Sequence, residues 1–346
     1  MTRGDSTPSL RTGGTNNMRS KTTFVFSLLV SLVIMAGCAL SDSAAVSTST
    51  AATSGADSVT LRYLGAAGWE ISAGSEAAGD EVVVLVDPYL TRANYSGAPS
   101  SDSTDTRPYY TRADTLFSDT DVIDANIDRV DYILVQHGHP DHVMDVPYLA
   151  HRTGAVVIGH ATTINIMRAY GVPDAQLVTV RGGEDYDFGD VSIRVIPSLH
   201  SPLGDKRYYQ SEVVEEGAVR PLRISQLVEG GSLMYLVRLA GHEVMTMGSM
   251  NYIAREVEGL RPDIALVGAA PSHLEIFDYT PRLMESLGFP SVVIPTHADN
   301  FRVPYGSPTA YRTDWVGAFA DEVRVASPDS RVIIPQHLEP FRLFLR

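Results

Sequence analysis

The sequence predicts a layered domain of the α/β or α+β class. From Val59 onward, short runs rich in β-branched residues alternate with stretches of helical periodicity. Residues 132–136 are apolar enough to form a strand buried on both faces. A hydrophobic content of 44% is ordinary for a globular protein, and 346 residues permit one large domain or two small ones.

The expected strands are short apolar segments bounded by turn-forming residues. They cover residues 59–64, 82–86, 132–136, 155–159, 191–196, 233–239, 244–247, 264–267 and 292–295. Periodicity predicts helices over residues 161–170, 279–287 and 308–323, and Gly171 is expected to cap the first. Similar strand pairs occur early and late, which suits a duplicated sandwich.

The first 57 residues are expected to lie outside the folded domain. Residues 24–36 form an apolar run preceded by Arg19 and Lys21, a pattern typical of a secretory signal. The run is short for a membrane-spanning helix. Residues 39–57 have the Ser, Ala, Thr and Gly composition of a flexible tether. The expected organisation is a signal peptide over 1–38, a tether over 39–57 and a folded domain over 58–346.

The segment Met-Ala-Gly-Cys ending at Cys38 resembles the lipobox of bacterial lipoproteins. In that family the cysteine is lipidated and becomes the mature N-terminus, although leucine is usual where Met35 stands. The resemblance implies an exported lipoprotein anchored to a membrane, on the periplasmic or outer side of the cell envelope. The alternative is an ordinary cleaved signal with a chance cysteine. Met18 is a second candidate start, because residues 1–17 are polar.

The charge of the chain disfavours a nucleic-acid partner. Residues 39–346 contain 23 basic and 40 acidic side chains, a net charge near −17, and such a surface repels phosphate backbones. The single cysteine, Cys38, excludes disulfides within the chain. Any metal site in the folded part must therefore use histidine, aspartate, glutamate or water.

The strongest chemical signal is the run His-Gly-His-Pro-Asp-His at residues 137–142, directly after an expected strand. On an extended turn, His137 and His139 point to the same side and can share one ion. Asp141 and His142 then turn toward a neighbouring position. Imidazole and carboxylate ligands suit zinc, and also iron or manganese.

Further ligands are expected from other strand ends. His200 and His297 each follow an apolar run in the same way as His137 does. Strand-terminal histidines at separated positions are what a metal site at one edge of a sheet requires.

The His-x-His-x-Asp-His pattern resembles the signature of the metallo-β-lactamase superfamily. The agreement extends to Tyr63-Leu64-Gly65, Gly68-Trp69 and Val86-Asp87-Pro88, and the similarity spans roughly residues 58–340. The resemblance implies an α+β fold, a four-layer αββα sandwich with one or two zinc ions at the sheet edge. It implies one metal bound by His137, His139 and His200, and another bound by Asp141, His142 and His297.

One position departs from this family pattern. Many members have an aspartate that bridges both metals, and Ser249 occupies that position here. Asp299, two residues after His297, is a candidate replacement ligand. The alternative is that Asp299 faces solvent or orders His297. Whether one or two metals bind is left open.

The implied activity is hydrolysis of an ester, lactone or phosphodiester by a metal-bound hydroxide. Asp141 is expected to orient the nucleophile, and His273 to act as a proton donor or substrate contact. The alternative for His273 is a loop histidine in water. Asp87 is expected to brace the metal loop by hydrogen bonds, with a plain turn as the alternative. Substrate specificity is expected in the long insertions 91–125 and 201–231, where Tyr and Arg side chains can line a pocket.

The general pattern of the sequence resembles the branch of the superfamily that contains ascorbate-phosphate lactonase and N-acyl phosphatidylethanolamine phospholipase D. That resemblance implies a small-molecule or lipid substrate. A β-lactamase is disfavoured by Ser249 and by the two insertions. The remaining alternative is a non-catalytic or sensory metal-binding lipoprotein that retains the fold, and the missing bridging aspartate supports it.

Overall fold

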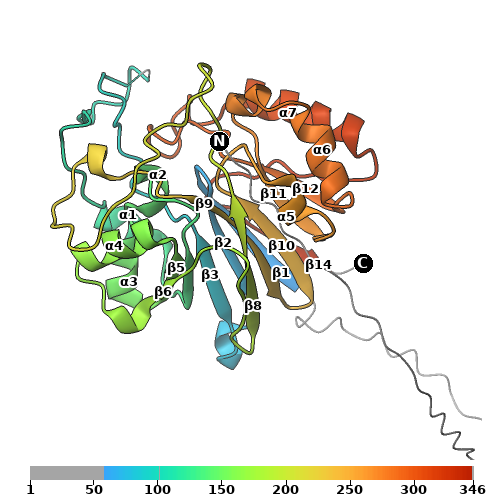
Figure 1. The fold of residues 1–346 in the computed structure, drawn as a ribbon, viewed down its shortest axis with the longest axis horizontal. Coiled ribbons are helices and arrows are strands. Elements are labelled where there is room, and N and C mark those ends of the chain that lie inside the picture. Colours follow the sequence, from blue (N-terminus) through green and yellow to red (C-terminus); the bar gives the residue numbers. More distant parts are fainter. Residues whose placement is uncertain (1–57, 101, 345–346) are drawn as a thin grey trace, which may run out of the picture. The chain divides into compact units, whose positions relative to one another are not determined.

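A computed structural model of the protein describes residues 58–100 and 102–344. Within them, two mixed sheets lie face to face, and helices cover the outer face of each sheet (Figure 1). The expected four-layer αββα sandwich is therefore confirmed. The expected signal peptide, tether and lipidation site at Cys38 lie outside the described residues. Within the described part, no helix is long and apolar enough to cross a membrane.

The two sheets follow one pattern of strand pairing. The described strands of the first sheet are, in spatial order, β14 (Pro340–Phe344), β1 (Ser58–Gly65), β2 (Gly68–Ala73), β3 (Val82–Val86), β4 (Tyr132–Leu134), β5 (Val156–Gly159) and β6 (Leu177–Thr179). Those of the second are β7 (Asp185–Asp187), β8 (Val191–Ser198), β9 (Ser232–Leu239), β10 (His242–Met247), β11 (Ile264–Gly268), β12 (Val292–Thr296) and β13 (Arg331–Val332). In each sheet, antiparallel pairing over the first four strands gives way to parallel pairing over the rest.

Helices pack on the two outer faces. The first sheet is covered by α1 (Thr120–Asn126), α2 (Pro140–Val143), α3 (Val146–Thr153) and α4 (Ala161–Ala169), and the second by α5 (Ala254–Val257), α6 (Tyr279–Ser286) and α7 (Thr313–Ala326) (Figure 1). The helix expected over 308–323 begins later, at Thr313. The preceding residues are used elsewhere, because Asn300 donates its backbone N–H to Ala310 O at 2.8 Å.

The main core lies between the sheets. Alternate residues of the facing strands, such as Leu61, Trp69 and Ile71 opposite Tyr235 and Leu266, are fully buried there. Replacing a buried aromatic residue such as Trp69 by alanine costs about 3–5 kcal/mol. This packing fixes the sheets relative to each other, and with them the loops at the strand ends.

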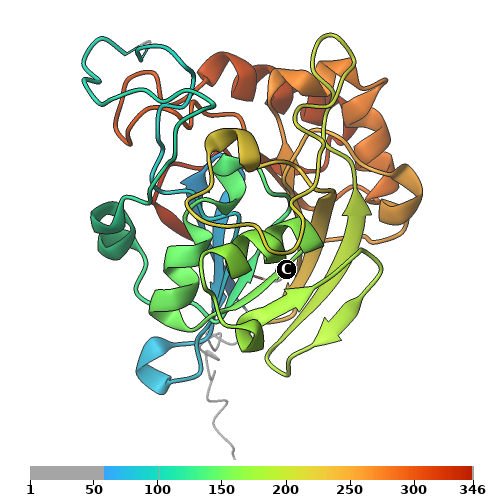
Figure 2. The ribbon, with the colours of Figure 1, turned by 60° about the vertical axis from the view of Figure 1, so that its left-hand side comes forward.

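The candidate ligands come from loops that follow strands of both sheets. His137 follows β4 of the first sheet, while His200 and His297 follow β8 and β12 of the second. Figure 2 shows the loop after β3 (teal) and the loop after β12 (orange-red) side by side at one end of the sheets. They are joined there by Arg92, which donates to Asn300 O at 2.7 Å.

Candidate metal centre

The His-Gly-His-Pro-Asp-His segment has a defined local structure. Pro140 is the first residue of α2, a position where its missing N–H costs nothing and its fixed φ suits the helix. A side chain at position 138 would place Cβ 2.4 Å from Val228 O, so glycine is required there. As a result, His137 and His139 lie on the loop, and Asp141 and His142 lie on the first turn of α2.

Three histidines form what we call the histidine group: His137, His139 and His200. One ring nitrogen from each lies within 4.8 Å of the others. Backbone carbonyls orient two of the rings, since His139 Nε2 donates to Tyr209 O at 3.1 Å and His200 Nδ1 donates to Ser201 O at 2.8 Å. Burial lowers the pKa of His139 to about 3 and that of His200 to about 4. Both rings are therefore neutral at pH 7, the state in which imidazole binds a metal.

The second set, the carboxylate group, consists of Asp141, His142 and His297. Their ligand atoms also lie within 4.8 Å of one another, and Asp141 Oδ2 is 3.4 Å from His142 Nε2 and 3.3 Å from His297 Nε2. Tyr95 donates its hydroxyl to the other oxygen, Asp141 Oδ1, at 2.9 Å. Asp141 thus turns one oxygen toward the two imidazoles.

An acidic side chain orients the central imidazole of the carboxylate group. His142 Nδ1 lies 2.7 Å from Asp87 Oδ2, and Asp87 Oδ1 accepts the backbone N–H of Gln136 at 2.7 Å. The predicted bracing role of Asp87 is confirmed. Burial alone would lower the pKa of His142, but Asp87 and Asp141 raise it to about 10.

The buried nitrogens of these groups fit a divalent cation. His137 Nδ1, His137 Nε2 and His142 Nε2 are buried and have no hydrogen-bond partner within the described part of the chain. Unpartnered buried polar atoms are costly, and a bound metal ion satisfies them. The His137 and His142 rings are adjacent, with centroids 3.7 Å apart, so the two groups adjoin. Five imidazoles and one carboxylate suit zinc, iron or manganese.

Ser249, at the position of the usual bridging aspartate, lines the same pocket. Its hydroxyl accepts the backbone N–H of Ser201 at 2.9 Å and lies 3.2 Å from Ser201 Oγ. A hydroxyl held in this way offers no negative charge to share between two ions. Asp141 is the one carboxylate among the described residues of the two groups.

Asp299, the candidate replacement ligand, lies outside both groups. Arg92 Nη1 and His337 Nε2 lie 2.8 and 2.9 Å from Asp299 Oδ2, while the N–H of Ala66 donates to Oδ1 at 2.9 Å. Burial alone would raise the pKa of Asp299, but Arg92 and His337 hold it well below its ordinary value. The carboxylate is therefore already occupied as the anion of a buried ion pair.

This ion pair supports the backbone around His297. His297 has a positive φ of 54° and donates its N–H to Ala66 O at 2.8 Å. Because Ala66 N is bonded to Asp299, the same short segment contacts both residues. Asp299 thus stands in the position of a residue that orders His297.

His273 is not brought to the metal groups. Its Nε2 lies 3.1 Å from Glu322 Oε1, and its Nδ1 donates to Ala270 O at 2.9 Å. Both ring nitrogens are thus engaged between α6 and α7. Its neighbour Ser272 lines the metal pocket, whereas His273 lines a groove beside α7.

The metal groups form the floor of a pocket of about 260 Å³. Both predicted insertions contribute to its wall, Tyr95 from the first and Tyr209 from the second. Phe301 and Arg302 complete one side. The sequence patterns predicted neither Tyr95 nor Arg302. For Tyr95, the aromatic content of the first insertion was the available signal.

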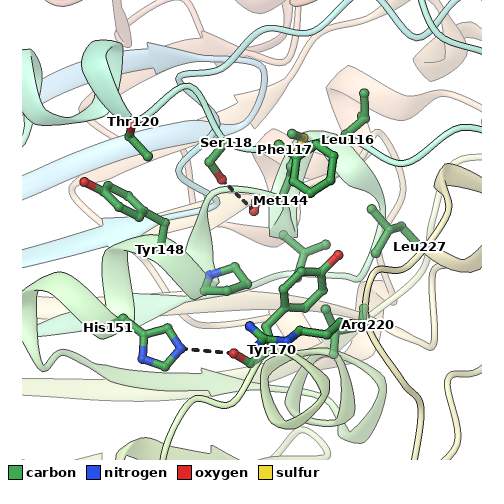
Figure 3. Close-up of a pocket in the computed structure, with 13 residues that line it drawn as sticks. Leu116, Phe117, Ser118, Thr120, Met144, Tyr148, His151, Tyr170, Arg220 and Leu227 are labelled. Carbon is green, nitrogen blue, oxygen red and sulfur yellow. Dashed lines mark hydrogen bonds between the residues drawn. The ribbon is translucent and has the colours of Figure 1, made fainter.

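A second pocket of similar size, about 280 Å³, lies beside α3 and α4. Figure 3 shows Tyr148, Tyr170 and Arg220 around it, with mostly apolar side chains between them. His151 also lines it and is bonded to Tyr170 O at 3.1 Å. This pocket contains none of the candidate ligands.

The chain matches a known protein family and is similar to curated proteins. The family described as "Beta-lactamase superfamily domain" matches residues 60–297. A curated relative, a metal-dependent hydrolase of Staphylococcus aureus (strain JH9), is 38% identical over 91 residues, which cover 25% of this chain and 39% of the relative. The chain therefore spans about two fifths of the length of the curated relatives that it matches.

Two solved structures resemble the chain at low sequence identity. Igni18, a metallo hydrolase from the archaeon Ignicoccus hospitalis, is 16% identical with a TM-score of 0.54, covering 84% of this chain and 100% of that one. CmlA, a diiron β-hydroxylase from Streptomyces venezuelae, is 18% identical with a TM-score of 0.49, covering 83% of this chain and 54% of that one.

Proposed function

We propose that this chain, a member of the metallo-β-lactamase superfamily, is a metal-dependent hydrolase that cleaves an ester, lactone or phosphodiester bond at the two metal groups. The observation that carries the proposal is the set of buried, unpartnered imidazole nitrogens on the floor of an open pocket. A divalent ion held there, zinc in this proposal, would lower the pKa of a bound water and polarise the bond under attack.

The side chains of the two metal groups are arranged to bind the ions and to orient the nucleophile in this proposal. The neutral rings of His137, His139 and His200 present lone pairs to one ion, and Asp141, His142 and His297 present theirs to the neighbouring position. Tyr95 fixes the rotation of the Asp141 carboxylate through Oδ1, which keeps Oδ2 available to an ion or a water proton. Asp141 is thus both a proposed ligand and the proposed group that orients the nucleophile.

The pocket above the floor suits a substrate with an apolar or aromatic part. Tyr209, Ile224, Met250 and Phe301 supply this surface. A lactone or a phospholipid-like diester fits such a lining, as the lactonase and phospholipase D branch would use. The relatives are named only as metal-dependent hydrolases, so the substrate is a proposal from the pocket.

A panel of substrates tests the activity. The protein is loaded with zinc and assayed with a p-nitrophenyl ester, a lactone, bis(p-nitrophenyl) phosphate and a cephalosporin. Turnover of one or more of the first three, lost on chelation and in His137→Ala, is expected. No turnover of any of the four by fully metallated protein would contradict the proposal and favour a metal-binding protein without catalytic activity, for which Ser249 is the specific observation.

We also propose that the protein is exported and anchored through a lipid on Cys38. The support is the sequence pattern around Cys38 alone. A Cys38→Ser variant should move from the membrane fraction to the soluble envelope fraction while keeping its metal content. Wild-type protein found in the soluble fraction would refute the anchor.

A further inference from the structure

One arginine beside the metal groups lacks an acidic partner. Arg302 follows β12 in the loop that carries His297, and its side chain lines the metal pocket. Its Nε is buried without a hydrogen-bond partner, and no carboxylate among residues 58–100 and 102–344 forms an ion pair with it. It is also the only arginine or lysine among the described residues that line this pocket.

Two aromatic rings hold the guanidinium. Arg302 Cζ lies 4.7 Å from the centroid of the Tyr95 ring and 5.0 Å from that of Phe301. Stacking on aromatic faces fixes the plane of a guanidinium while leaving its N–H groups in that plane free to donate. Both rings also line the pocket, so the charge is held at the wall of the site.

Arg92, a second arginine in the same region, has a structural role and serves as a comparison for Arg302. Arg92 is 1% exposed and is satisfied by Asp299, by Asn300 O and by Val303 O. Arg302 is less buried and makes no comparable set of bonds. Arg92 therefore stabilises the fold, whereas the guanidinium of Arg302 remains available to a ligand.

The carboxylate of Asp141, a neighbouring negative charge, already has other partners. Asp141 accepts from Tyr95 with Oδ1 and faces His142 and His297 with Oδ2. Burial alone would lower the pKa of Arg302, but Tyr95 and Asp141 raise it, and Asp141 does so without forming an ion pair with it. A guanidinium that is partly removed from water and has no ion-pair partner is a binding site for an oxyanion.

We propose that Arg302 binds an anionic group of the substrate, a carboxylate or a phosphate oxygen, so that the enzyme selects anionic substrates. This inference rests on the proposed hydrolase function of the same pocket. Planar oxyanions accept two parallel N–H bonds from one guanidinium, which would place the bond to be cleaved at a fixed distance from the metal groups. Tyr95 and Phe301 act as positioning residues for that arginine.

The test compares substrates in the wild type and in two variants of Arg302. The zinc-loaded wild type, Arg302→Met and Arg302→Lys are assayed with p-nitrophenyl butyrate, mono-p-nitrophenyl glutarate and bis(p-nitrophenyl) phosphate. Arg302→Met should lower kcat/KM about 10- to 100-fold for an anionic substrate and leave the neutral ester within about twofold, as expected for loss of a charge-assisted contact to the anion. Arg302→Lys should recover part of the loss, and metal content should not change. The glutarate and phosphate arms distinguish a carboxylate from a phosphate ligand.

A control of the same contact type is available. Arg282 Cζ lies 5.8 Å from the Tyr252 ring centroid, outside the metal pocket, so Arg282→Met removes a stacked arginine without touching the site. It should not change the preference. Equal losses for neutral and anionic substrates in Arg302→Met would overturn the inference and make Arg302 a support for Tyr95 and Asp141.

Failure of the hydrolase proposal would be visible separately, as no turnover in the wild type. In that case, calorimetric binding of glutarate and of inorganic phosphate to metal-loaded wild type and Arg302→Met decides the inference. Weaker binding to the variant supports it, and binding that is equal in the two proteins, or absent from the wild type, overturns it.

Discussion

The histidine group and the carboxylate group differ in what holds their imidazoles. His139 and His200 donate to backbone carbonyls, so a fixed backbone orients them and no side chain adds charge. His142 is oriented by the carboxylate of Asp87 and lies next to that of Asp141. Carboxylate partners raise the basicity of an imidazole ligand and attract a cation more strongly than neutral acceptors do. We therefore expect the two positions to differ in metal affinity and in response to pH.

The largest effect should follow loss of a ligand from either group. His139→Ala and Asp141→Ala should each lower kcat/KM by at least about 10³-fold, because a divalent ion supplies several kcal/mol of charge stabilisation. Metal counting on the purified variants then tests the comparison. Each variant should lose the ion of its own group. Loss of all metal from both variants would break the comparison and indicate one shared site.

Asp299→Ala tests whether a further acid belongs to the carboxylate group. The change leaves Arg92 buried without its partner, which should cost about 3–5 kcal/mol of unfolding free energy. Urea unfolding of metal-free protein measures this cost. Metal stoichiometry should be unchanged in the folded variant, and a loss of one ion per chain would instead make Asp299 a ligand.

The Asp87→Asn variant tests directly whether the two groups differ in metal affinity. Removing the carboxylate that orients His142 should weaken metal binding in the carboxylate group about 10- to 100-fold and leave the histidine group unchanged. Competition with a chromophoric chelator measures both affinities. Glu322→Gln is a matched control, since Glu322 contacts His273 at 3.1 Å away from the site. Equal weakening of both ions would count against separate roles.

The metal-free protein should respond to pH in opposite directions through the two groups. The pKa of His139, about 3, and that of His200, about 4, lie below the ordinary value near 6.5, so the unfolded chain takes up these protons first and stability falls as pH drops below about 6.5. The pKa of His142 is raised to about 10, so its contribution is full below about 6.5 and is lost as pH rises toward 10.

Unfolding free energies from denaturant titrations between pH 4.5 and 9.5 measure both effects, with a slope of about 1.4 kcal/mol per pH unit for each titrating histidine, and therefore about twice as steep on the acid side as on the alkaline side. His139→Asn should flatten the acid limb and His142→Asn the alkaline limb. A variant that flattens the other limb would reverse the assignment.

The smallest effect should come from His273, which lies outside both groups. His273→Gln should leave kcat/KM within about threefold and cost about 1 kcal/mol of stability through the bond to Glu322. Steady-state kinetics and urea unfolding measure the two quantities. A loss of activity above about tenfold without loss of metal would restore His273 as a proton donor.

Local sequence patterns predicted the metal ligands because the strand before each of the separated histidines places it. His137, His200 and His297 each follow an apolar run, and a buried strand places the residue after its end at the sheet edge. Asp87 was placed by the same logic. The prediction for Asp299 relied on its closeness in sequence to His297, but the positive φ of His297 and the distant Arg92 direct that carboxylate elsewhere.

The walls of the site could not be predicted in this way. Tyr95 and Arg302 lie in segments without periodicity, and long-range contacts place them, such as the bond from Arg107 to Arg302 O. Strand β14 was not predicted, because a long-range contact also determines its structure. Only pairing with β1 makes a strand of its five residues, and the two are far apart in the chain.

The origin of the ligands in both sheets also bears on how the chain is held together. With Cys38 as its only cysteine, the protein cannot form an internal disulfide. An ion held by His137 and His200, or by Asp141 and His297, would act as a reversible cross-link between distant parts of the chain and would restrict the unfolded ensemble as a covalent bridge does. Since the unfolded chain lacks the preformed site, the melting temperature should rise with the logarithm of free metal concentration. A bound ion would then also stabilise the fold, to a degree set by the concentration of free metal in the surrounding medium.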